Sequence, residues 1–231
     1  MHILAGEFKG RTLLSPPAHS QTRPVTGLVK KSLFDMLMPV LEGARVADLY
    51  CGTGTMGLEA LSRGAAWCAF AERDRAVIER LRRNIQACRV DDRCRVWAGD
   101  IHRRLGHWLG ELDAPLDLAF VDPPYAESRQ WDWRQAAERI FGPLADRLAD
   151  EGLVVLRLGD RAQPPRELAG LRPLRVRQYG KMTVALLAKP PAGNQEPAAG
   201  DQKSEFAEQG NESTGPPVNQ VMDEPGRELT K

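Results

Sequence analysis

Short apolar runs alternate with amphipathic stretches through the central part of the chain. Each run of four to six mainly apolar residues ends in a polar or glycine-rich turn, a pattern typical of strands buried in a sheet. Between the runs, apolar residues three to four positions apart predict helices. The predicted strands are Arg45–Tyr50, Trp67–Ala71, Arg95–Ala98, Leu116–Val121, Leu153–Leu158, Leu174–Tyr179 and Thr183–Ala188, and the predicted helices are Met56–Arg63, Arg75–Cys88 and Trp131–Leu148.

This alternation of strands and helices predicts an α/β fold. A mostly parallel sheet in such a fold is covered by helices on both faces. The last two predicted strands are separated only by Gly180–Met182, so we expect them to form an antiparallel hairpin at the edge of a seven-stranded sheet. Ligands bind beyond the carboxyl ends of the parallel strands, and the turns that follow those strands are therefore candidate functional segments.

Residues 1–40 precede the alternating pattern and form a predicted N-terminal extension. Gly6 and Gly10 predict turns in a short strand pair within Ile3–Leu14. After a proline-rich loop, apolar residues recur on one face of a predicted helix from Thr26 to Met38. We expect the main domain to span residues 41–189.

The last 42 residues, 190–231, have a different composition. Only nine of them are apolar, so this segment cannot bury enough surface to offset its chain entropy, and we predict a disordered acidic tail. It carries a net charge of −5, which leaves +6 on residues 1–189 although the whole chain carries only +1. A moderately basic domain is compatible with an anionic partner such as nucleic acid.

The cysteines and histidines show no metal-binding spacing. The four cysteines, at positions 51, 68, 88 and 94, contain no C-x-x-C pair and are not joined by histidines at zinc-finger distances, so we expect neither a metal nor a disulfide framework. No apolar segment approaches the roughly 18 residues of a membrane helix, and the N-terminus lacks a signal-peptide pattern. We therefore expect a cytoplasmic monomer without a membrane partner.

A glycine pattern follows the first predicted strand of the main domain. Gly52-x-Gly54-x-x-Gly57 allows the backbone to pass close to a ligand and to turn into a helix N-terminus. Glu72 ends the second strand, 20 positions after Gly52, where a carboxylate can accept both ribose hydroxyls. These residues fit a nicotinamide dinucleotide as well as another adenosine nucleoside, so this part of the sequence leaves the cofactor open.

The turns after the third and fourth strands separate these two interpretations. Asp100 can accept a hydrogen bond from an adenine amine while Ile101 packs on the ring. In the "VDPPY" segment, the prolines fix the backbone so that the Asp122 side chain and the Pro123 carbonyl can converge on an amine with two N–H bonds. Tyr125 offers a face on which a flat ring can stack. A hydride-transfer site has no use for this arrangement.

With these residues the sequence resembles the S-adenosylmethionine-dependent methyltransferases of exocyclic amino groups, which carry a [DN]-P-P-[YF] motif. More closely, it resembles the family that methylates the N2 amine of a guanine in small-subunit (16S) ribosomal RNA. The resemblance covers residues 1–188. It is carried, in the family's order, by "AGEFKGRTL", "RPVTGLVKKSLFDML", "VADLYCGTGTMGLEALSRGAA", "AERDRAVIERLRRNI", "DLAFVDPPYA" and "RQYGKMTVALL".

The resemblance implies a Rossmann-like methyltransferase fold and assigns roles to individual residues. Catalysis on the target guanine is assigned to Asp122, Pro123, Pro124 and Tyr125. The S-adenosylmethionine site is assigned to Asp48, Cys51, Gly52, Thr53, Gly54, Glu72, Asp100 and Ile101. The N-terminal extension would face ribosomal RNA or the small ribosomal subunit through Lys9, Arg11, Arg23, Lys30 and Lys31.

The sequence departs from the family where contact with the substrate is expected. The usual pattern is R-P-T-x-x-R-V-R-E-x-L-F; this chain keeps Arg23 and Pro24 but has Val25, Leu28, Lys30 and Lys31 in place of Thr, Arg, Arg and Glu. Lysine still meets a phosphate, without the bidentate geometry of arginine. The departure concerns the choice of nucleotide and leaves the predicted cofactor unaffected.

Other functions stay open at this point. A DNA adenine-N6 or a protein glutamine-N5 methyltransferase shares the logic of the motif. However, the chain has no sizeable target-recognition insert, and the glutamine enzymes carry Asn at the position of Asp122. A catalytically silent RNA-binding assembly factor is a candidate from another class. Attack on a pyrimidine by the Cys51 thiolate is disfavoured because this cysteine lies in the predicted cofactor loop.

Overall fold

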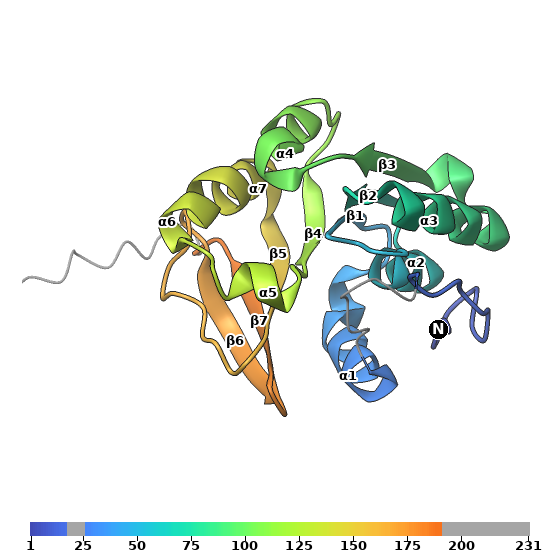
Figure 1. Cartoon of the computed structure of the whole chain (residues 1–231), viewed down its shortest axis with the longest axis horizontal. Helices are drawn as coiled ribbons and strands as arrows, with labels where there is room; N and C mark the ends of the chain where they lie inside the picture. The colour runs from blue at the N-terminus through green and yellow to red at the C-terminus, as the bar shows by residue number, and fades with distance from the viewer. Residues whose placement is uncertain (18–25, 191–231) are drawn as a thin grey trace, which may run out of the picture. The chain divides into compact units, whose positions relative to one another are not determined.

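A mixed sheet forms the centre of the protein in the computed structural model, which describes residues 1–17 and 26–190 (Figure 1). The strands in this part of the chain are β1 (Arg45–Leu49), β2 (Trp67–Glu72), β3 (Cys94–Ala98), β4 (Leu116–Val121), β5 (Leu148–Leu158), β6 (Arg172–Tyr179) and β7 (Met182–Ala188). Their order across the sheet is β3-β2-β1-β4-β5-β7-β6. Strands β1 to β5 run parallel to one another, whereas β7 pairs antiparallel with both β5 and β6. The predicted fold class and C-terminal hairpin are confirmed.

Helices cover both faces of this sheet. They are α1 (Gly27–Leu37), α2 (Thr55–Ser62), α3 (Arg75–Cys88), α4 (Ile101–Gly110), α5 (Tyr125–Ser128), α6 (Trp133–Ala136) and α7 (Gly142–Arg147), with short helical segments η1 (Met38–Val40), η2 (Asp91–Arg93) and η3 (Ala137–Phe141). Apolar side chains of the strands point alternately into two layers. One layer also contains residues of α1, α2 and α3, and the other contains residues of α4, η3 and α7. Burial on both faces explains why β1, β2, β4 and β7 are nearly continuous apolar runs, whereas the edge strand β6 is mostly exposed.

The N-terminal segment packs against α2 and α3 through polar side chains that those helices bury. The Glu59 carboxylate accepts hydrogen bonds from the backbone N–H groups of Leu4 and Ala5 at 2.8 and 3.1 Å. Asn84 holds the backbone of Leu14 in the same way at 2.7 Å. Ile3, Phe8 and Leu13 also join the apolar layer of α1 and α2. The segment is therefore part of the core, and its assignment as an RNA-facing extension stays a prediction.

The structure differs from the sequence-based expectations in several places. The strand pair within Ile3–Leu14 is reduced to a single antiparallel bridge, His2 to Thr12, because Glu59 and Ser62 take up the intervening backbone donors. The predicted helix Trp131–Leu148 is broken into α6, η3 and α7: Asp132 caps the start at Trp133, and Gly142-Pro143 follows a π-helical turn. Helix α4 was not predicted.

Some sequence-based predictions concern residues that the structure does not describe, or absences that it can report only for the described residues. The tail at 191–231 and the loop at 18–25 lie outside the described residues, so the disorder predicted for the tail stays a prediction. In the described part of the chain, no helix is long and apolar enough to cross a membrane. The same residues contain no cluster of three or more histidine, cysteine or acidic side chains suited to a metal ion.

Candidate functional site

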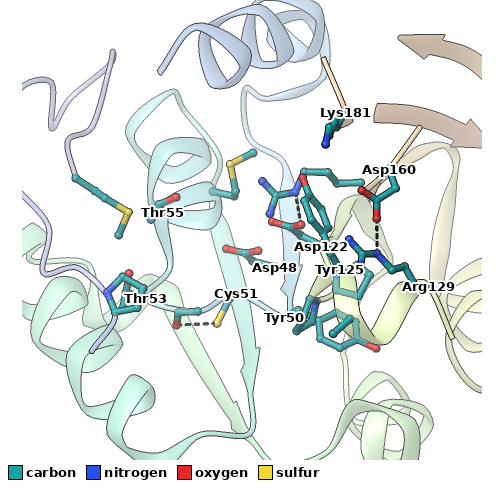
Figure 2. Close-up of a pocket in the computed structure, with 18 residues that line it drawn as sticks. Asp48, Tyr50, Cys51, Thr53, Thr55, Asp122, Tyr125, Arg129, Asp160 and Lys181 are labelled. Atoms are coloured by element: carbon teal, nitrogen blue, oxygen red, sulfur yellow. Dashed lines mark hydrogen bonds and ion pairs between the residues drawn. The ribbon is translucent and has the colours of Figure 1, made fainter. Parts of the chain in front are cut away.

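Two adjoining cavities lie beyond the carboxyl ends of the parallel strands. The first, of about 440 Å³, lies against the turns after β1, β4 and β5 (Figure 2). The second, of about 380 Å³, lies against the turns after β1, β2 and β3. Both cavities are lined by Tyr50, Gly52, Asp122, Pro124 and Ala126. The turn after β1 and the Asp122 turn thus separate two spaces that together can hold an extended ligand and a second molecule.

The glycines of the first turn have three different physical roles. Gly52 has a φ of +55° and no atom within 4 Å of the position of a Cβ, so the backbone is open to a ligand there. Gly54 precedes α2 with a φ of +83°, and a Cβ on it would lie 2.5 Å from the Leu81 side chain. A Cβ on Gly57 would lie 2.6 Å from the Cys68 sulfur and overlap the Phe70 ring. Only the first of these glycines faces the ligand space.

Asp48 is a buried acid at the end of β1. Its carboxylate accepts a hydrogen bond from the Gly57 N–H of α2 at 2.8 Å, which ties the strand to the helix. Burial raises the pKa of Asp48 to about 7, and the nearby Asp122 carboxylate contributes to the rise. Asp48 lines the first cavity, so its charge at that wall changes near neutral pH.

Cys51 and Thr53 complete the wall of the first cavity next to Asp48. Burial raises the pKa of the Cys51 thiol well above its ordinary value, which makes it a poor nucleophile at neutral pH and agrees with the rejection of a covalent thiolate mechanism. The Thr53 hydroxyl is buried without a hydrogen-bond partner among the described residues. Since buried polar groups are normally paired, this hydroxyl is suited to a bound ligand.

Glu72 and Asp100 lie at the second cavity, as predicted, and both also hold the backbone. One Glu72 oxygen accepts from the Gly52 N–H at 3.1 Å and the other from the N–H groups of Arg73 and Asp74. Asp100 caps α4 by accepting from the His102 N–H at 2.9 Å. Ile101 lines the same cavity. The carboxylates are thereby fixed in orientation before any ligand binds.

Asp122 forms an ion pair with Arg157, a residue that the sequence analysis did not identify. Arg157 belongs to β5, the neighbour of β4 in the sheet, and its Nε donates to an Asp122 carboxylate oxygen. Both side chains are mostly buried. Burial raises the pKa of Asp122 above its ordinary value, and the Arg157 guanidinium limits that rise. The Arg157 Nη1 is buried with no hydrogen-bond partner among the described residues, and Arg157 lines the first cavity.

Tyr125 stands beside this ion pair at the start of α5 (Figure 2). The Arg157 guanidinium lies 5.7 Å from the centre of its ring. A Cβ on Gly159 would lie 2.7 Å from the ring, so the glycine is what allows the turn after β5 to pass there. Among the described residues no donor bonds to the Pro123 carbonyl, and Pro123 lines the same cavity. Asp122, Pro123 and Tyr125 therefore line one cavity, and the convergence of the Asp122 carboxylate and the Pro123 carbonyl on an amine stays a prediction.

A polar cluster in the second cavity was also missed. The Tyr50 hydroxyl donates to Glu127 at 2.8 Å, and His102 Nε2 lies 2.9 Å from the same carboxylate oxygen. Burial, with the adjacent Glu127 charge, raises the pKa of Tyr50. Tyr50 directly follows β1 with a φ of +59°, a strained conformation for a tyrosine. That unusual turn was not visible in the residue pattern, because nothing in "DLYCG" requires a positive φ at the tyrosine.

The predicted RNA contacts divide into three groups. Lys9, Arg11 and Lys31 are exposed, and their contact with RNA stays a prediction. Arg23 lies outside the described residues. The predicted RNA contact of Lys30 is wrong. Only 4% of this residue is exposed, and its ammonium group forms an ion pair with the buried Glu59 at 2.7 Å. It stabilises the contact of α1 with α2 and is not available to a surface ligand.

Comparison with known proteins identifies the family. Residues 1–188 match the family model described as "Conserved hypothetical protein 95". The curated Ribosomal RNA small subunit methyltransferase D of Escherichia coli is 33% identical over 67% of this chain and 72% of its own length. The chain belongs to this family of methyltransferases. The resemblance inferred from the motifs is confirmed.

Further relatives agree with this assignment. The "Putative rRNA methyltransferase YlbH" of Bacillus subtilis is 31% identical over 82% of this chain and 99% of its own length. The solved structure of the "Putative methyltransferase yhhF" from Escherichia coli superposes with a TM-score of 0.67 at 30% identity, covering 82% of this chain and 97% of that one. A "putative methyltransferase complexed with SAH", SMU.776, shares the fold at a TM-score of 0.57 and 13% identity, covering 70% of this chain and 50% of that one.

Proposed function

We propose that the protein transfers a methyl group from S-adenosylmethionine to the exocyclic N2 amine of a guanine in small-subunit ribosomal RNA. The observation that carries the proposal is the position of Asp122-Pro123-Pro124-Tyr125 between the two strand-end cavities, in a chain of this methyltransferase family. The names of its relatives support ribosomal RNA as the substrate class. The choice of guanine N2 comes from the motif resemblance.

Except for Gly54, the proposed cofactor residues line one or both of the two cavities. Glu72 is suited to the ribose hydroxyls, and Asp100 with Ile101 to the adenine. Asp48, Cys51, Gly52, Thr53 and Gly54 form the loop that would receive the methionine part. The open space at Gly52 and the unpaired Thr53 hydroxyl fit a ligand at this place. When bound, S-adenosylmethionine supplies an electrophilic methyl group on a positively charged sulfur.

The turn after β4 would then make the guanine amine more nucleophilic. The lone pair of an aryl amine is delocalised into the ring and is poorly nucleophilic. Acceptance of its two N–H bonds by the Asp122 carboxylate and the Pro123 carbonyl favours a pyramidal nitrogen with a localised lone pair. With S-adenosylmethionine held in the neighbouring cavity, that lone pair would be directed at the methyl group, and the sulfur would keep the electrons of the C–S bond. One N–H proton then leaves to Asp122, whose raised pKa suits an acceptor of that proton.

Arg157 acts on the same carboxylate as a positioning residue. Its Nε bond to one Asp122 oxygen leaves the other oxygen for the amine and limits rotation of the carboxylate. Its charge also favours the ionised form of Asp122 at neutral pH. Tyr125, whose ring lies at the same wall, would stack on the guanine after the base leaves its RNA helix.

A substrate panel tests the proposal. Purified protein is incubated with radiolabelled S-adenosylmethionine and, in parallel, with undermodified small ribosomal subunits, naked 16S RNA, duplex DNA and a glutamine-containing protein. We expect label only in RNA, recovered after digestion as N2-methylguanosine. Label in DNA adenine would favour the alternative enzyme class. RNA binding without any transfer would favour a silent assembly factor.

A further inference from the structure

A third hollow lies between α1 and β6 on another part of the domain. Its volume is about 510 Å³, and its lining has no residue in common with the two strand-end cavities described above. It is lined by Leu28, Lys31, Ser32, Asp35 and Met36 of α1 and by Arg175 and Arg177 of β6. We call it the α1–β6 groove. Because β6 is the edge strand of the sheet, one side of the groove is unprotected by further strands (Figure 1).

The two arginines of β6 point to the α1 side of the sheet. Directly opposed residues of antiparallel strands share a face, and Arg175 and Arg177 pair with Leu186 and Val184. Those two residues belong to the apolar layer that includes α1. Tyr179 lies two positions after Arg177, on the same face, and its hydroxyl is 2.8 Å from the Ser32 hydroxyl of α1. The orientation of both guanidinium groups follows from this register.

These arginines are not used to hold the fold. Within residues 1–17 and 26–190, neither Arg175 nor Arg177 has a carboxylate partner, whereas the neighbouring Arg172 pairs with Glu167 at 3.0 Å. Lys31 has only the exposed Asp35 on its own helix, at 2.6 Å. Such exposed pairs contribute little to stability and exchange readily for another anion. The groove therefore presents three cations against one carboxylate, and an anionic ligand complements it.

The groove leads toward the first strand-end cavity. Arg175 and Arg177 are about 7 Å apart along the strand, from the usual rise per residue. The strand then ends at Gly180-Lys181, and Lys181 itself lines the first cavity (Figure 2). A row of cations thus runs from the groove to the place proposed for the target base. Repeated charge along a path fits a nucleic-acid backbone better than a single small anion.

We infer that the α1–β6 groove binds the phosphate backbone of the substrate RNA next to the target guanine, through Arg175, Arg177 and Lys31. The exposed Leu28, of which 79% is accessible, contacts the sugar or base of the same strand. This inference rests on the proposed function, since it assigns the substrate of that site a second point of attachment. It adds Arg175 and Arg177 to the RNA contacts and gives Lys31 a defined position among them.

The test compares Arg175→Ala/Arg177→Ala with Arg82→Ala/Arg83→Ala. The control removes the same charge from exposed arginines of α3, away from the groove. RNA binding is measured by anisotropy between 50 and 200 mM salt, and methyl transfer is measured at 100 mM. We expect the groove variant to raise the KM for RNA about tenfold or more and to reduce the slope of log affinity against log salt by about 1.4 to 1.8, the value for two phosphate contacts. Its kcat and its affinity for S-adenosylmethionine stay at wild-type values.

Four outcomes distinguish the possibilities. An unchanged KM and salt slope in the groove variant, with wild-type protein that methylates RNA, overturns the inference and leaves the proposed function intact. An equal loss in the α3 control also overturns it, because the attraction would then be general. If wild-type protein methylates no RNA, the proposed function fails, while the salt slope still decides whether the groove binds RNA. Retained RNA affinity with lost binding of an acidic peptide would assign the groove to a protein partner instead.

Discussion

Removal of the Glu59 charge is expected to destabilise the protein more than removal of the charge of its partner, Lys30. The Glu59 side chain is fully buried in α2 and joins three parts of the chain. Its two oxygens accept hydrogen bonds from Lys30 Nζ at 2.7 Å, Arg63 Nε at 2.8 Å and the backbone N–H groups of Leu4 and Ala5 at 2.8 and 3.1 Å. Burial alone raises the pKa of Glu59, but these donors outweigh it and hold the pKa below its ordinary value.

The two partners differ in what each leaves behind. Glu59→Gln leaves the Lys30 ammonium group buried without a charged partner, because the single amide oxygen of Gln cannot replace the carboxylate, and the His2 carbonyl lies 3.5 Å from Nζ. Breaking a buried pair in this way costs about 3–5 kcal/mol. Lys30→Met leaves the Glu59 carboxylate paired with Arg63 and two backbone N–H groups. It removes one charge-assisted hydrogen bond, so we expect about 1.5 kcal/mol, the lower end of the range for such bonds.

Urea unfolding followed by circular dichroism measures both free energies at pH 7. The double variant Lys30→Met/Glu59→Gln should be more stable than Glu59→Gln alone, because it removes the unpaired ammonium group. Lys30→Met should also leave the KM for RNA within about twofold, since that change corresponds to well under 1 kcal/mol. A Lys30→Met protein that is as unstable as Glu59→Gln, or that is fully stable but binds RNA poorly, would refute this account of the pair.

Three further predictions follow from the site. Affinity for S-adenosylmethionine should rise between pH 6 and 8. The Asp48 pKa of about 7 makes this acid negative mainly at the upper end of that range, and a cationic sulfur favours the negative form. Calorimetry measures the affinity, and the Asp48→Asn variant should lose this pH dependence. Arg157→Ala should lower kcat on the order of a hundredfold and move the acidic limb of the pH profile to higher pH, with partial rescue in Arg157→Lys; an unchanged profile argues against positioning. Gly57→Ala should cost about 1–3 kcal/mol by overpacking, measured by urea unfolding, whereas the control Gly106→Ala in α4, with no atom within 4 Å of its Cβ, should be neutral or stabilising.

The centre of the sheet could be predicted because β1, β2 and β4 are buried on both faces. Leu116–Val121 shows this well: it is apolar at almost every position and lies in the centre of the sheet, so pattern and structure agree at both ends. Helix α4 was missed because two glycines and two histidines lower the helix propensity of this short segment, although Ile101, Leu105 and Leu109 are buried four positions apart. Its N-cap, Asp100, had been assigned only to the cofactor.

The residues of the candidate site also differ in whether they could be predicted from the sequence. Residues that directly follow parallel strands could be found from the sequence, since the topology brings strand ends together. Arg157 could not, because it lies inside a strand and its role depends on the register that sets β5 beside Asp122. Lys30 was misassigned because a lysine on a helix is usually exposed, and only the position of Glu59 across the core shows otherwise. The local pattern of residues does not contain the information on which distant segments lie side by side.

The most direct test of the proposed chemistry is Asp122→Ala, assayed for cofactor binding and for methyl transfer on the same preparation. Circular dichroism first establishes that the variant is folded, because the substitution leaves the Arg157 guanidinium without its carboxylate. The account predicts S-adenosylmethionine affinity within about tenfold of wild type, a change of at most 1.4 kcal/mol, together with no detectable N2-methylguanosine in the RNA. Transfer by the folded variant at near wild-type rate would contradict it.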